Sequence, residues 1–245
     1  MIAAGRAVIE AGGVLREAIS QPPVTLRQVR SEDPAICQVC VVGSAAGPLA
    51  ADRIELDVQV RPGAAAALIA TGASLAQGRG GGASRLLTRL AVAEGAQLTG
   101  EPAPLIVCAG STVEVELDIR LATTASLRWR ELLVLGRLGE SAGAAILDWR
   151  LTRAGRPVLR QRIDLTSSGL LRWPGMVARA EVLGSALVTG PEVRARTLIH
   201  SPTAVCQPID DGTALITVLE ADAASAARNL DLLLAELESG APAVR

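Results

Sequence analysis

The feature that most constrains this chain is an unbroken alternation of apolar and polar residues from position 112 to position 121. Every second position is apolar, and the positions between carry Thr, Glu, Asp or Arg. The apolar members are Val113, Val115, Leu117, Ile119 and Leu121. Only an extended chain puts such a set on one face, because a helix would scatter the charges around its axis. The segment is therefore predicted to be a β-strand with one buried face.

The same pattern occurs three times, at residues 54–60, 86–93 and 113–121, each time followed by a small turn that contains alanine. The turn residues Ala64, Ala96 and Ala125 lie about 30 residues apart, a spacing typical of repeated structural units. We therefore predict a mainly β fold: a helically wound, two-layer, β-solenoid-like sheet in a single domain spanning residues 1–245. An antiparallel meander with similar turns is the alternative interpretation.

The composition argues against several classes of function. The 245 residues are 49% apolar but include no Phe or Tyr, so the core must be built from Leu, Val, Ile and Ala. A net charge of −1 and three aromatic side chains offer neither a basic surface nor stacking platforms, so we do not expect nucleic-acid binding. The sequence contains no signal-peptide core, no apolar run able to span a membrane and no disulfide-type cysteine spacing. A cytoplasmic location without membrane attachment is expected.

The remaining segments add strands and one clear helix. Residues 1–20 fit either a strand or a short helix, and residues 177–188 have a mixed pattern. Further strands are predicted at 24–30, 36–42, 144–152, 158–165, 197–208 and 213–219, with a mobile glycine-rich loop at 78–82. The C-terminal segment is predicted to be a helix capped by Asp222, with one apolar stripe. The stripe comprises Ala226, Leu230, Leu233, Leu234 and Leu237.

Candidate chemical motifs are weak. The spacing of Gly78, Gly80 and Ala83 matches the G-x-G-x-x-A fingerprint of dinucleotide-binding sites. The fingerprint requires a helix to follow, whereas the segment that follows here has the pattern of a strand. Cys37 and Cys40 form a CxxC within a predicted strand, where they point to opposite faces and are expected to be structural. Cys108 and Cys206 lie in apolar segments and are expected in the core, and His200 is the only histidine. A metal role for the cysteines or His200 stays open, and a hydrolase built around His200 remains the third class of function.

Five short motifs occur in order along the chain. They are VTLR at 24–27 with VGSAAGPL at 42–49, VRPGAAAA at 60–67, EPAPLI at 101–106, WREL at 129–132 with LGR at 135–137, and GRPVL at 155–159. In this order they resemble the signature segments of the urease accessory protein family UreD, also called UreH, in its actinobacterial form. The residues that carry the resemblance are Gly47, Pro48, Asp52, Gly63, Glu101, Pro102, Gly110, Trp129, Glu131, Gly136 and Arg137. The chain departs from the family at Ala50 and Ala51, where two glycines precede the aspartate.

The resemblance implies a mostly β, non-enzymatic scaffold. Such a protein would form a complex with UreF and the GTPase UreG, dock on the urease structural subunits, and assist delivery of nickel with the lysine carbamate. Nickel would be bound transiently, with no tightly bound cofactor, and models of the family send it through an internal tunnel. A β-rich interaction scaffold without a metal role is the second reading.

The implied function singles out four carboxylates as candidates for lining a nickel path: Asp52, Glu101, Glu131 and Asp148. Oxygen ligands would hold nickel weakly enough to release it. The structural alternative is that these carboxylates are paired with nearby arginines, such as Arg130 or Arg150. The glycine-rich loop and exposed apolar parts of the C-terminal half are candidate partner contacts.

Overall fold

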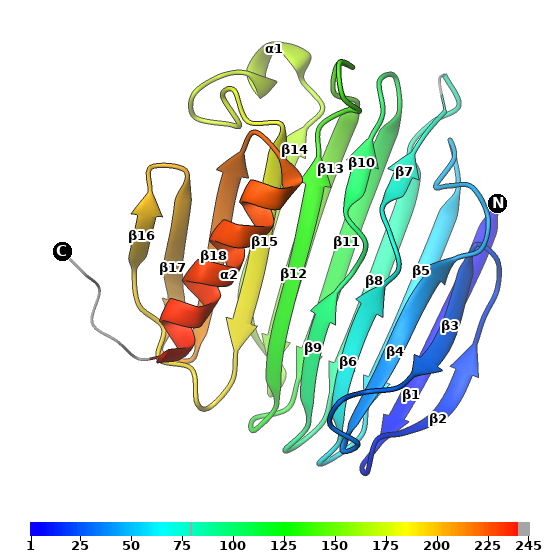
Figure 1. Ribbon diagram of the computed structural model, residues 1–245, viewed down its shortest axis with the longest axis vertical. Helices are drawn as coiled ribbons and strands as arrows, with labels where there is room; N and C mark the ends of the chain where they lie inside the picture. The colour runs from blue at the N-terminus through cyan, green and yellow to red at the C-terminus, as the bar shows by residue number, and fades with distance from the viewer. Residues whose placement is uncertain (79, 240–245) are drawn as a thin grey trace.

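The structure, a computed structural model, describes residues 1–78 and 80–239. Two β-sheets pack face to face, and one long helix lies across the outer face of the larger sheet (Figure 1). The predicted mainly β, two-layer architecture with a C-terminal helix is confirmed.

The seven-stranded sheet has the order β14 (Arg156–Leu165), β13 (Ala144–Arg153), β11 (Thr112–Leu121), β8 (Ser84–Val92), β5 (Arg53–Val60), β1 (Ile2–Glu10) and β2 (Val14–Ile19). The main path of the eleven-stranded sheet is β16 (Leu198–Ser201), β17 (Ala204–Asp210), β18 (Thr213–Glu220), β15 (Val182–Thr189), β12 (Ser126–Val134), β9 (Gln97–Glu101), β6 (Ala65–Ala70), β4 (Ile36–Gly43) and β3 (Val24–Val29). Two short strands, β7 (Ser74–Ala76) and β10 (Leu105–Val107), join it beside β12. The helices are α1 (Ser168–Leu171) and α2 (Ala223–Ser239).

The chain winds between the sheets as a coil. β5, β8 and β11 each turn into a strand of the other sheet, namely β6, β9 and β12. Neighbouring coils pair in parallel in both sheets, as in β5–β8, β8–β11, β6–β9 and β9–β12. The antiparallel meander is therefore wrong for this region, and antiparallel pairing is confined to the flanking strands.

The predicted turn alanines stack at one end of the coil. Ala64, Ala96 and Ala125 are fully buried. Gly63 and Gly95, which begin or precede these turns, have φ values of +69° and +66°, a conformation that glycine adopts without steric cost. The amide of Gly63 donates to Glu94 O at 3.0 Å, which joins adjacent turns. This end of the coil therefore has short, regular turns, whereas the connections after β6, β9 and β12 lie at the other end (Figure 1).

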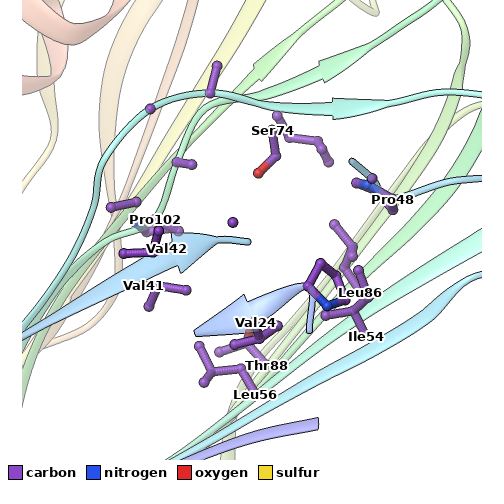
Figure 2. Close-up of a pocket in the computed structure, with 18 of the residues that line it drawn as sticks. Val24, Val41, Val42, Pro48, Ile54, Leu56, Ser74, Leu86, Thr88 and Pro102 are labelled. Atoms are coloured by element: carbon purple, nitrogen blue, oxygen red, sulfur yellow. The ribbon is translucent and has the colours of Figure 1, made fainter. Parts of the chain in front are cut away.

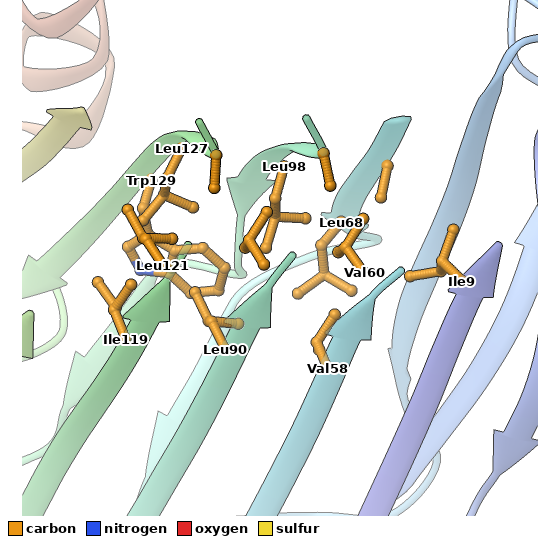
Figure 3. Close-up of a cluster of buried hydrophobic side chains, with 14 of the residues drawn as sticks. Ile9, Val58, Val60, Leu68, Leu90, Leu98, Ile119, Leu121, Leu127 and Trp129 are labelled. Atoms are coloured by element: carbon orange, nitrogen blue, oxygen red, sulfur yellow. The ribbon is translucent and has the colours of Figure 1, made fainter. Parts of the chain in front are cut away.

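The main core lies between the sheets. Figure 3 shows Leu68, Leu98, Leu127 and Trp129 of the eleven-stranded sheet facing apolar side chains of the seven-stranded sheet. The facing residues include Val58, Val60, Leu90, Ile119 and Leu121. The alternation that predicted these strands therefore identified their inner faces correctly.

The helix α2 begins after Asp222, whose Oδ1 accepts the Ser225 amide at 2.8 Å, as the capping pattern predicted. All five residues of its apolar stripe are buried against the outer face of β15, β17 and β18. Within the described residues, neither helix is long and apolar enough to cross a membrane.

Several local expectations are corrected or decided. Residues 1–20 form two antiparallel strands, β1 and β2, rather than a helix. The segment at 197–208 is two strands, β16 and β17, joined by a turn, and the mixed segment contains the strand β15. β8 follows the glycine-rich segment where a dinucleotide site needs a helix, which rules out that fingerprint.

The prediction of a mobile loop at 78–82 includes residue 79, which lies outside the described residues. Of its neighbours, Gly78 and Gly81 pack on Ala50: an added Cβ would lie 2.8 Å and 2.5 Å from the Ala50 Cβ. The glycines therefore permit close contact with the segment that carries Gly47 and Pro48.

Candidate functional site: a cavity and a buried carboxylate between the sheets

A cavity of about 280 Å³ lies between the two sheets, near the end that carries the connections after β6, β9 and β12. Its walls are mostly apolar: Val24, Val41, Ile54, Leu56 and Leu86 come from the strands. Figure 2 shows these side chains around a common space, with Ser74 and Pro48 at its margin. The connections contribute Gly47, Pro48, Gly72, Ala73 and Pro102. Four of the residues that carry the family resemblance, Gly47, Pro48, Pro102 and Trp129, thus line one cavity.

Trp129 joins this cavity to Glu131. Its ring lines the cavity, and its Nε1–H donates a 2.8 Å hydrogen bond to Glu131 Oε1. Leu127, Trp129, Glu131 and Leu133 occupy alternate positions of β12, so Glu131 projects toward the space between the sheets. The ring is seated over Gly100 on β9, where an added Cβ would lie less than 3.0 Å from Trp129 Cε3 and Cζ3.

Glu131 is a largely buried carboxyl without a cationic partner among the described residues. Burial raises its pKa, since the charged form loses hydration, while the indole N–H groups of Trp129 and Trp149 oppose the rise. The Trp149 Nε1 is buried, and within the described part of the chain no acceptor meets the full distance and angle criteria for a hydrogen bond with it. The carboxyl therefore sits in a site that favours its neutral form and has a second donor close by.

Two hydroxyl side chains continue from Glu131 along the inner face of the larger sheet. The register pairs Glu131 with Ser185 on β15, and Ser185 with Thr217 on β18. Directly opposed residues of antiparallel strands have Cβ atoms about 5 Å apart. The three polar side chains therefore form a row on the inner face of the larger sheet.

The other three carboxylates are placed differently. Glu101 Oε2 lies 3.0 Å from Arg130, whose guanidinium also contacts Asp231 of α2 on the outer face of the larger sheet. Asp148 lies on the outer face of the smaller sheet, 2.9 Å from Arg150 and 3.7 Å from both Arg160 and Arg162. The arginine pairing predicted as the alternative for Glu101 and Asp148 is thus observed.

Asp52 anchors the start of β5. Its Oδ1 accepts from the Met1 ammonium at 2.7 Å, and its Oδ2 accepts from the Leu49 amide at 2.8 Å. Burial favours a higher pKa, but these hydrogen bonds together outweigh it and lower the pKa of Asp52. Both oxygens are therefore committed to structure. Ala51, before it, has a φ of +61°, so alanine adopts the left-handed conformation where the family has glycine.

The motif at 136–137 forms part of the connection that follows β12. Gly136 has a φ of +93°, and the Arg137 guanidinium donates to both oxygens of Glu140, at 2.9 and 3.0 Å. The hydrogen bond from Arg137 lowers the pKa of Glu140 to about 2. Gly110 likewise occupies a positive-φ position, at +74°. These motif residues shape connections rather than offering ligands.

The cysteines and His200 do not assemble a reactive site. All four cysteines are free and buried, and burial raises the pKa of Cys206 to about 11, which keeps that thiol neutral at pH 7. His200 is exposed on β16. Across residues 1–78 and 80–239, no three His, Cys, Asp or Glu side chains gather closely enough to hold a metal ion.

The comparisons with known proteins agree with the motifs. The family model described as "UreD urease accessory protein" matches residues 4–243. The chain belongs to the UreD family. Urease accessory protein UreD 1 of Saccharopolyspora erythraea is 36% identical over 228 residues, which cover 89% of this chain and 86% of the relative. Urease accessory protein UreD 3 of Streptomyces griseus is 32% identical over 234 residues, covering 92% and 91%.

Family membership makes this chain a urease accessory protein. Glu131 is the one predicted nickel-path carboxylate that the fold directs between the sheets. Sequence reasoning missed Gly100, Trp149, Ser185 and Thr217, which surround or continue from it. The sequence did contain one signal for the inward direction of Glu131. This residue lies two residues from Trp129 in a predicted strand, and residues two apart in a strand share a face.

Proposed function

We propose that this chain is a non-catalytic scaffold that acts with UreF and the GTPase UreG on apo-urease and assists nickel delivery. The observation that carries the metal role is Glu131, a partly buried carboxyl that no cation neutralises among the described residues and that Trp129 links to a cavity of about 280 Å³. Burial raises the pKa of Glu131, and ionisable groups with strongly perturbed pKa values are often functional.

The chemistry suits transient passage of a cation. A carboxylate is a ligand that nickel accepts, and ligands must lose their protons to bind a metal. A bound cation would stabilise the charged form of Glu131 and so oppose the effect of burial on its pKa. A single carboxylate offers few donor atoms, which favours release over retention.

Trp129 would control access between the cavity and Glu131. Its ring contributes to the cavity wall while its Nε1–H holds the carboxylate. The hydroxyl groups of Ser185 and Thr217 supply further oxygen atoms beyond Glu131. This order gives a path with an apolar entrance and a polar interior.

The second candidate is a scaffold without a metal role. It is favoured by the structural roles of Asp52, Glu101 and Asp148, which all bind cationic groups of the chain itself. In that case Glu131 would be a structural hydrogen-bond partner for the two tryptophans.

Glu131→Gln separates the two candidates, because glutamine keeps the size of the side chain and can accept from Trp129 but cannot become an anion. Urease co-expressed with the variant is expected to contain less nickel and to have correspondingly lower activity at limiting nickel. Glu101→Gln, which changes a carboxylate on the outer face, is the matched control and should activate normally. Full activation with Glu131→Gln would exclude that residue from the path and support the scaffold.

A further inference from the structure

The two sheets end at different places on the C-terminal side of the sandwich. The smaller sheet ends at β14, whereas the larger one continues beyond β15 through β18, β17 and β16. β14 contacts β17 across the sandwich, so β16 extends beyond the last strand of the smaller sheet (Figure 1). The position next to β14, facing β16, holds no strand of the described chain.

At this position the inner face of the larger sheet is only partly covered. Ile199 on β16 pairs with Val205 on β17, and Val205 pairs with Thr217 on β18, so these three share the inner face of the larger sheet. Ile199 is 71% exposed, and Val205 and Thr217 are half-buried. The opposite face of the same strands, which includes Leu198 and Cys206, is buried beneath α2. Ile199 is thus exposed because the smaller sheet has no described strand opposite β16.

The free edge of β14 is basic. The strand carries Arg156, Arg160 and Arg162 but only one acidic residue, Asp164. Arg160 and Arg162 pair with Arg150 and Asp148 across the strands and so lie on the outer face. They share Asp148 with Arg150, so three guanidinium groups approach one carboxylate. An added strand would therefore meet an excess of positive charge on its solvent side.

We propose that β14 accepts an extended segment of a partner protein by strand addition, and that this segment alternates apolar with acidic residues. Its backbone would pair with the open edge of β14, as in other cases of β-augmentation. Its apolar residues would cover Ile199 and Val205, and its acidic residues would lie beside Arg160 and Arg162. The inference concerns a docking edge and is independent of any nickel path.

A second copy of this chain fits the edge poorly. Pairing β14 with another β14 would place arginine rows side by side, and like charges directly opposite each other destabilise strand pairing. Pro157 and the arginines also protect the edge against self-association, as they do on other exposed edges. The charge pattern thus favours an acidic strand over self-pairing.

The test uses the full chain and a fluorescent octapeptide of four Val–Glu repeats, with four Val–Lys repeats as the control peptide. Fluorescence anisotropy measures binding, and hydrogen exchange followed by mass spectrometry locates it. The Val–Glu peptide is expected to bind at least about tenfold more tightly than the Val–Lys peptide, with an affinity that falls as salt rises. Amide exchange is expected to slow in β14 and not in β2, the other edge of the same sheet.

Three variants test the location and the charge preference. Ile199→Asp changes an exposed side chain, so the fold should survive, and it is expected to weaken the Val–Glu peptide about tenfold or more. Ile2→Asp, at the far end of the sandwich and 74% exposed, should leave binding unchanged. Arg160→Gln with Arg162→Gln should remove the preference for the acidic peptide.

Three results would overturn the proposal. The first is the absence of detectable binding of the Val–Glu peptide. The second is slowed exchange at β2 rather than β14. The third is a concentration-dependent dimer of the unliganded chain that Ile199→Asp dissociates, because the edge would then be occupied by a second copy.

Discussion

Replacing Gly100 by alanine tests the packing that positions Trp129 and, through it, Glu131. The added methyl group would lie less than 3.0 Å from two carbons of the Trp129 ring, so the ring must move. Trp129 is fully buried, and the surrounding core leaves it little room. Overpacking of this kind costs about 1–3 kcal/mol, and complete loss of a buried tryptophan's packing costs about 3–5 kcal/mol.

We therefore expect Gly100→Ala to lower the free energy of unfolding by about 3 kcal/mol, near the overlap of these two ranges. Urea denaturation followed by tryptophan fluorescence measures the change as a lower midpoint with a similar slope. Gly72→Ala is the matched control, because Gly72 also lines the cavity but has no atom within 4 Å of an added Cβ. Its effect should stay within about 0.5 kcal/mol.

A double-mutant cycle identifies the cause. Trp129→Leu alone removes a large ring and destabilises, but it also opens the space that a methyl group added at position 100 needs. The two changes together should therefore cost less than the sum of each, with a coupling of about 0.5–3 kcal/mol. Strict additivity, or a cost of Gly100→Ala below about 0.5 kcal/mol, would refute the proposed seating of the ring.

Three further predictions concern stability. Burial raises the folded-state pKa of Glu131, so the wild type should lose stability as pH rises from the ordinary carboxyl pKa through the raised value, and Glu131→Gln should remove this dependence. Urea unfolding at several pH values measures it, and a variant with the same pH profile as the wild type would contradict it. Ala51→Gly should stabilise by about 1 kcal/mol in thermal unfolding, because Ala51 has a φ of +61°; destabilisation would show that the conformation is not strained. Leu234→Ala, on the buried stripe of α2, should cost about 2–5 kcal/mol, whereas Leu232→Ala, whose side chain is 52% exposed, should cost less than about 0.5 kcal/mol; similar costs would contradict the assigned helix face.

The coil was predictable from sequence because its strands each bury one face. Alternation marked the inner faces of β5, β8 and β11, and the turn alanines gave the repeat. β15 could not be recognised in this way: all eight of its residues are buried, since the smaller sheet covers one face and α2 the other. A strand that is buried on both faces has no alternating polar positions by which it could be recognised.

The roles of the carboxylates were predictable only in part. Pairing with Arg130 and Arg150 was an expected alternative for Glu101 and Asp148, whereas the added contacts of Asp148 with Arg160 and Arg162 depend on the pairing of β13 with β14. Glu131 is directed inward by the phase of β12 and meets Trp149 from the opposite sheet. The parallel register that brings Gly100 beneath Trp129 likewise joins residues from separate repeats.

Obstructing the cavity tests the proposed internal path most directly. Ser74→Trp would place a bulky ring at the margin of the cavity, where the serine side chain lies (Figure 2), and Ser74→Ala is the control. Urease nickel content and activity are measured after co-expression at limiting nickel, with folding of each variant confirmed by its urea midpoint. The account predicts that a folded Ser74→Trp variant delivers markedly less nickel than Ser74→Ala. Equal nickel loading by the two folded variants would contradict passage through this cavity.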